Sequence, residues 1–115
     1  MKKPEEELVT QLAAVLGIET DMGLEYLKQA LRNALLFERK QKDYGSGNIS
    51  VFGAKGVIVR ASDKVQRLKH LVFDRGPVSG DGVPEAPLNE SVADSWDDLA
   101  NYGVIGRLCV DGKWK

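Results

Sequence analysis

The sequence predicts an all-α protein, an antiparallel bundle of about four helices within a single domain that spans residues 1–115. In four segments, apolar residues recur every three or four positions, which is the spacing of an amphipathic helix. Stretches rich in Gly, Pro and Asn separate these segments, and the chain contains no obvious sheet. Four successive helices joined by loops imply an antiparallel bundle, within one chain or in a dimeric equivalent.

The first two helices are predicted over residues 3–16 and about 21–41. Pro4 lies in the first turn of the first segment, where its missing N–H costs nothing, and Gly17 is the expected stop. The second segment carries the longer apolar stripe. This stripe consists of Leu24, Leu27, Leu31, Ala34 and Leu35.

A Gly-rich loop is predicted over residues 43–55, after Gly45 ends the second helix in a left-handed conformation. Val51 and Phe52 are expected to anchor this loop by packing. The loop lacks the G-x-x-x-x-G-K-[ST] spacing of a phosphate-binding loop, so we do not interpret it as one.

The third helix is predicted over about residues 56–73, and a Gly- and Pro-rich loop follows over residues 74–89. The last helix is expected from Glu90 to about Val110, with Gly112 after its end.

Composition excludes several classes of function. The single cysteine, Cys109, and the single histidine, His70, are too few for a Cys/His zinc site or a Ser-His-Asp triad. The net charge of −1 and the lack of a concentrated basic stripe argue against binding of nucleic acid. No apolar run approaches 18 residues and no signal-peptide pattern is present, so we expect a cytoplasmic protein without a membrane partner.

The last predicted helix has an unusually acidic face. Glu90, Asp94, Asp97 and Asn101 fall within about 60° of one another on a helical wheel. Like charges at this spacing repel, and no basic residue joins the stripe before Arg107. One interpretation is a Mg²⁺ site, because hard cations prefer carboxylate oxygens. The other is a solvated helix start whose acids complement the helix dipole.

Two further helices carry polar residues that allow two interpretations each. Glu38 continues the apolar stripe of the second helix, where a carboxylate needs a metal or a partner such as Lys42. On the third helix, Arg60, Asp63, Lys64 and Arg67 share one face. That face is either a salt-bridged solvent face or a site where Asp63 meets a metal and the cations meet phosphate oxygens.

Taken in order, these motifs resemble a known family. The motifs are Lys42-Asp43-Tyr44-Gly45, Phe52-Gly53 to Gly56-Val57, Arg60-x-x-Asp63-Lys64-x-x-Arg67-Leu68 and Asn89-Glu90-Ser91-x-x-Asp94-x-x-x-Asp98-Leu99-Ala100-Asn101-Tyr102. Over residues 24–108 the chain resembles the nucleotide-modification-associated domain common in phages. That domain is similar to the all-α NTP pyrophosphohydrolases, the superfamily of MazG, HisE and dimeric dUTPases.

The resemblance implies a Mg²⁺-dependent enzyme, with Mn²⁺ as a substitute, that cleaves a (d)NTP between its α- and β-phosphates. It further implies a role in phage nucleotide metabolism in the host cytoplasm, with dGTP as the specific candidate substrate, and a homodimer or homotetramer. The alternative function is a non-catalytic helical interaction protein whose acidic face is solvated.

The resemblance also implies site residues. In the superfamily, E-x-x-E and E-x-x-D pairs on adjacent helices hold the metals. Here Glu90 and Asp94 approximate the second pair at a spacing of four, and no E-x-x-E occurs in the second or third helix. Glu38 and Asp63 therefore complete the expected metal set, with Glu38 and Asp94 as the catalytic pair. The expected nucleotide-binding residues are Asp43, Tyr44, Arg60, Lys64, Arg67, Asp98, Asn101 and Tyr102. Tyr44 is equally suited to stack on a base or to pack as a core aromatic.

Overall fold

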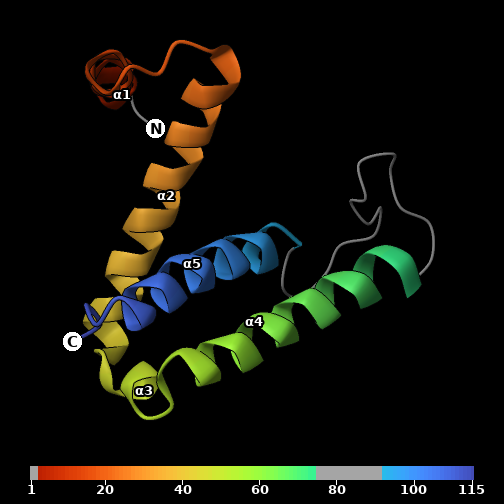
Figure 1. The fold of residues 1–115 in the computed structure, drawn as a ribbon. Helices are drawn as coiled ribbons and strands as arrows, with labels where there is room; N and C mark the ends of the chain where they lie inside the picture. Colours follow the sequence, from red (N-terminus) through yellow and green to blue (C-terminus); the bar gives the residue numbers. More distant parts are fainter. Residues whose placement is uncertain (1–2, 75–91) are drawn as a thin grey trace. The chain divides into compact units, whose positions relative to one another are not determined.

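The computed structural model describes residues 3–74 and 92–115, and helices account for 86% of these residues (Figure 1). The described ranges contain no strand, so the predicted all-α class is confirmed for them. The elements are α1 (Lys3–Leu16), α2 (Asp21–Tyr44), α3 (Gly47–Ser50), α4 (Gly53–Lys69), a π-helical turn (His70–Asp74) and α5 (Val92–Val110). None of these helices is long and apolar enough to cross a membrane.

The chain divides into two compact units, Met1–Arg39 and Lys40–Lys115. In the first unit, Gly17 ends α1 with a φ of 79°, as predicted. The N–H groups of Gly17 and Ile18 donate to the carbonyls of Ala14 and Ala13, which is the pattern of a Schellman cap. Thr20 then caps α2, because its Oγ1 accepts a hydrogen bond of 2.9 Å from the N–H of Gly23.

The apolar stripe predicted on α2 contains no buried residue among the described contacts. No residue of α2 is buried, and on α1 only Val9 and Ala13 are buried among the residues whose side chains are described. Other large apolar side chains of this unit remain exposed, including Leu8, Val15, Met22, Tyr26 and Leu35.

In the second unit, α4 and α5 pack side by side in opposite directions (Figure 1). At one end of the pair, Leu68, Leu71 and Val92 form a buried cluster. At the other end, a Cβ atom added to Gly106 of α5 would lie 3.5 Å from Val57 of α4, so the two backbones approach closely there. In this unit, α4 and α5 are therefore antiparallel neighbours, as expected for two helices of the predicted bundle.

The segment after α2 differs from the predicted loop over residues 43–55. α2 continues to Tyr44, and Gly45 then ends it with a φ of 68°, as expected. The next residues form the short helix α3 and the start of α4. Val51 and Phe52 are 70% and 73% exposed, so the prediction that they anchor the segment was wrong. The turn of α3 instead points Ile49 inward, where it is buried.

The boundaries of the last two predicted helices also change. The third helix begins three residues early, at Gly53, and its last residues form the π-helical turn in place of α-helix. α5 ends at Val110 and Gly112 follows with a φ of 71°, as predicted. The loop predicted over residues 74–89, apart from Asp74, and the expected helix start at Glu90 lie outside the described residues.

Candidate functional site

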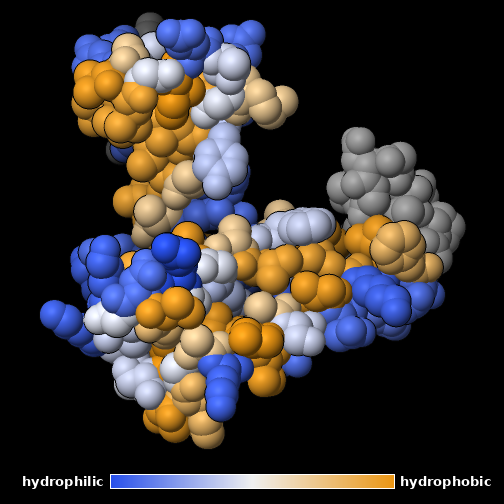
Figure 2. Space-filling view, in the orientation of Figure 1, coloured by the Kyte–Doolittle hydropathy of each residue, from blue (hydrophilic) through white to orange (hydrophobic). Residues whose placement is uncertain are grey.

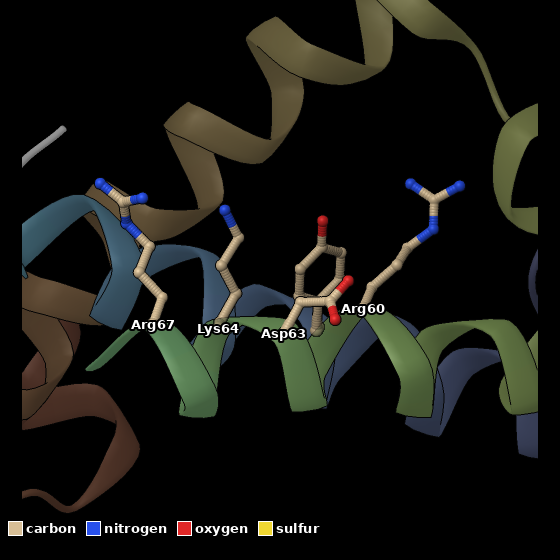
Figure 3. A pocket seen from close by; sticks show the side chains of 5 residues that line it. Arg60, Asp63, Lys64 and Arg67 are labelled. Carbon is tan, nitrogen blue, oxygen red and sulfur yellow. The ribbon is translucent and has the colours of Figure 1, made fainter. Parts of the chain in front are cut away.

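One face of α4 carries a row of charged side chains that line an open hollow of about 420 Å³ (Figure 3). Arg60, Asp63, Lys64 and Arg67 lie on this face because they are spaced three, four and seven residues apart. Tyr102 of α5 completes the lining. Asp63 is exposed and the other four residues are half-buried. The hollow therefore offers three cationic groups, one carboxylate and one phenol.

Asp98 of α5 joins this row to the end of α2. Its carboxylate accepts a hydrogen bond of 2.6 Å from Lys40 Nζ, and its other oxygen lies 3.0 Å from Lys64 Nζ. The Asp98 side chain is 14% exposed, whereas those of Lys64 and Lys40 are 22% and 49% exposed. Lys64 thus belongs both to the hollow and to this three-membered ion pair, which we call the Lys40–Asp98–Lys64 cluster.

The two lysines determine the charge of Asp98. Burial by itself would raise the pKa of this carboxyl group, because it removes water from the charged form. The hydrogen bonds and positive charges of Lys40 and Lys64 outweigh that effect, and the pKa of Asp98 lies below its ordinary value. Asp98 is therefore a stable anion at neutral pH.

Asp97 behaves in the opposite way. Burial raises its pKa, and the negative charges of Asp94 and Asp98 raise it further, while Lys40 lowers it. The upward contributions dominate, so the pKa of Asp97 lies above its ordinary value. Burial is the largest of these contributions, and the two neighbouring carboxylates add to it.

Arg60 is oriented by the short helix α3. Its Nη2 donates a hydrogen bond of 3.3 Å to the backbone carbonyl of Asn48. An arginine has five N–H donors, so this bond leaves donors for a ligand in the hollow.

The structure brings together some of the predicted nucleotide-binding residues. Arg60, Lys64, Arg67 and Tyr102 meet at the hollow, and Asp98 reaches it through Lys64. Asp43 and Tyr44 are exposed at the end of α2, so the alternative of Tyr44 as a core aromatic does not hold in this unit. Asn101 is half-buried on α5.

The four predicted metal ligands are distributed differently. Asp63 lines the hollow, and Asp94 is exposed on the first turn of α5. Glu38 is exposed in the other unit, and Glu90 lies outside the described residues. Within residues 3–74 and 92–115, no three His, Cys, Asp or Glu side chains are grouped so that they could hold a metal ion.

Two charged residues near the hollow, Lys40 and Asp97, were not among the predicted site residues. Lys40 pairs with Asp98 across 58 positions of the chain, and no local spacing predicts such a contact. Asp97 lies on the predicted acidic face of α5 but stands outside the family-like motif. Its pKa is raised, first by burial and then by the charges of Asp94 and Asp98.

Comparison with known proteins identified no relative of this chain. No protein-family model matches the chain, and neither a curated protein nor a solved structure matches it significantly.

Proposed function

We propose that this chain is a Mg²⁺-dependent nucleoside triphosphate pyrophosphohydrolase of the MazG-like, all-α type. It would cleave a (d)NTP, with dGTP as the specific candidate, between the α- and β-phosphates to give monophosphate and pyrophosphate. The observation that supports this proposal best is the hollow in which Arg60, Lys64 and Arg67 meet on one face of α4. The family-like motif contains all three of these residues.

The chemistry of the hollow suits a polyphosphate. A triphosphate carries several negative charges, and cleavage at phosphorus develops further charge on a bridging oxygen. Guanidinium groups bind two phosphate oxygens at once, whereas an ammonium group acts as a compact point charge. Arg60 and Arg67 would therefore orient the phosphates, and Lys64 between them would neutralise the charge that develops. Tyr102 would donate its phenolic hydroxyl to the nucleotide.

Carboxylates from three helices would hold the metal. Glu38, Asp63, Glu90 and Asp94 are the proposed ligands, and the described members of this set do not form a metal-binding group on their own. When bound, Mg²⁺ would offset phosphate charge and activate a water molecule. Glu38 and Asp94 are the carboxylates proposed to accept a proton from that water.

Exposed apolar surface supports self-association. Large hydrophobic side chains are exposed in both units, among them Val15 and Tyr26 in the first and Ile58, Val65 and Val104 in the second. Figure 2 shows apolar patches on the surface of the chain. Each full burial of such a side chain contributes about 1.5–3 kcal/mol. We propose that a homodimer or homotetramer covers part of this surface.

Incubation of the protein with each dNTP and NTP, in Mg²⁺ or Mn²⁺, tests the reaction. We expect ion-exchange chromatography to show a monophosphate and pyrophosphate from at least one nucleotide, and chelation to abolish both products. Arg67→Ala should lose most of the turnover, whereas Arg32→Ala, a change on exposed α2, should retain it. Absence of product from every nucleotide, with a folded protein and both metals, would refute the proposal.

The second candidate is a non-catalytic helical interaction protein. The same exposed apolar side chains favour it, together with the lack of a metal-binding group among the described residues. This candidate predicts no nucleotide turnover, no dependence on a divalent metal, and an acidic face on α5 that tolerates Asp94→Asn.

A further inference from the structure

The C-terminal tail contacts the short helix α3, far from it in sequence. Trp114 Nε1 donates a hydrogen bond of 3.1 Å to the backbone carbonyl of Ser46, 68 positions earlier in the chain. The direction of the tail is fixed by a Schellman cap at the end of α5. In this cap, the N–H of Gly112 donates to the carbonyl of Cys109 and the N–H of Lys113 donates to that of Leu108. The cap thus directs the next residue, Trp114, toward α3.

Ser46 is the residue on which α3 depends. Its carbonyl accepts hydrogen bonds from the N–H groups of Ile49 and Ser50 and from the hydroxyl of Ser50, in addition to the Trp114 indole. Its own hydroxyl accepts a bond of 2.6 Å from Gln41 Nε2. Gln41 in the last turn of α2, the first turn of α3 and the C-terminal tail are therefore tied to the same residue.

α3 needs such ties because it is only four residues long. A helix of this length does not recover the entropy of fixing its first turn, so contacts from outside must hold it. Ile49 is its one buried residue. Asn48, the second residue of α3, presents the carbonyl that accepts the hydrogen bond from Arg60. A displacement of α3 would therefore move the acceptor that orients Arg60.

We infer that Trp114 is a positioning residue for the hollow on α4. By holding Ser46 it holds α3, and through the Asn48 carbonyl it keeps the Arg60 guanidinium turned as a phosphate site requires. The inference rests on the proposed polyphosphate-binding role of the hollow. It adds a C-terminal residue, outside the family-like motif, to the structure that supports the site.

The indole contact itself can be tested without any ligand. The chain has two tryptophans, Trp114 and the 57% exposed Trp96 on α5, so Trp96→Phe assigns the two indole N–H signals by NMR. We expect the Trp114 N–H to exchange with solvent at least about tenfold more slowly than that of Trp96, as a hydrogen-bonded group does. Equal exchange rates would overturn the inference and leave the proposed function untouched.

The effect on the site is tested with inorganic tripolyphosphate, which carries the phosphates without base or sugar. Trp114→Phe removes the N–H donor and keeps an aromatic ring. We expect calorimetry in the absence of metal to show about fivefold weaker binding, the equivalent of one ordinary hydrogen bond. Trp96→Phe is the matched control and should bind like the unmodified protein.

A double-mutant cycle separates positioning from general loosening of the fold. If Trp114 acts through Arg60, Trp114→Phe should cost no further affinity in an Arg60→Ala background. In a Lys64→Ala background the fivefold loss should persist, because Lys64 is held by Asp98. Equal losses in both backgrounds would overturn the inference. Failure of the unmodified protein to bind tripolyphosphate would overturn it as well, together with the proposed function.

Discussion

Asp98→Asn perturbs the Lys40–Asp98–Lys64 cluster with almost no change in shape. The amide of asparagine can still accept a hydrogen bond, but it carries no negative charge. Two ammonium groups then face each other beside a side chain that is only 14% exposed in the unmodified protein. The substitution should therefore be more harmful than loss of an ordinary surface ion pair.

The two contacts of Asp98 differ in their expected contributions. A partly buried hydrogen bond to a charged group, such as that of Lys64, contributes about 1.5–3 kcal/mol. The Lys40 side chain is 49% exposed, so its pair contributes at most about 1 kcal/mol. We expect Asp98→Asn to lower the free energy of unfolding by about 2–3 kcal/mol, and Lys40→Met by less than about 1 kcal/mol.

Urea denaturation followed by circular dichroism measures both changes. The pKa of Asp98 is lowered in the folded state, so its stabilisation is present above the ordinary value of 3.8 and is lost as the pH falls through the folded pKa. The unmodified protein and Asp98→Asn should thus differ at neutral pH and converge in acid, once the pH lies below the folded pKa of Asp98. A loss below about 0.5 kcal/mol at pH 7, or one that persists unchanged in acid, would refute the assigned role of the cluster.

Three further predictions concern single side chains. Asp97 has a raised pKa, so its negative charge destabilises the fold at neutral pH. This penalty is lost as the pH falls from the folded pKa to the ordinary value of 3.8. Asp97→Asn should therefore raise the melting temperature at pH 7 and have little effect at pH 3. Ser95 of α5 is fully buried, and its Oγ has no hydrogen-bond partner in the part of the chain that the structure describes. Ser95→Ala should be neutral or stabilise the protein by up to about 1 kcal/mol in denaturation experiments, whereas Ser95→Leu should destabilise it by about 1–3 kcal/mol through overpacking. Light scattering should give two or four times the chain mass of 12.6 kDa. Val15 of α1 is 84% exposed, and Val15→Asp should reduce the measured mass without loss of helix. A monomeric unmodified protein would contradict the proposed assembly.

Local patterns predicted the parts of the fold that local interactions determine. The ends of α1 and α5 follow from Gly17 and Gly112, because each glycine takes the left-handed conformation that a Schellman cap requires. The helical spacing also placed Arg60 and Lys64 on one face of α4, where they meet at the hollow. Such features depend only on residues within a few positions of one another.

Features that depend on tertiary contacts did not follow from the sequence. The Gly-rich composition of the segment after α2 favoured a loop, yet α3 forms there with support from Gln41 and from Trp114 near the C-terminus. The apolar stripe on α2 correctly predicted a helix. It did not predict that no residue of this helix is buried. The pairing of Lys40 with Asp98 spans 58 positions, beyond the reach of any helical wheel.

The acidic end of α5 is where the two candidate functions differ most. Lysines neutralise Asp98, whereas burial and, after it, the negative charges of Asp94 and Asp98 raise the pKa of Asp97. A cation bound by Asp94 would offset that charge, and at a concentration of 100 times its dissociation constant it would stabilise the fold by about 2.7 kcal/mol. We therefore expect Mg²⁺ to raise the melting temperature of the unmodified protein. Asp94→Asn should abolish this rise and the turnover while retaining full helicity, and Glu19→Gln, a change at an exposed acid of the first unit, should retain both. If Mg²⁺ has no effect and Asp94→Asn keeps its turnover, Asp94 is a solvated acid at a helix start, as its exposed position on the first turn would also allow.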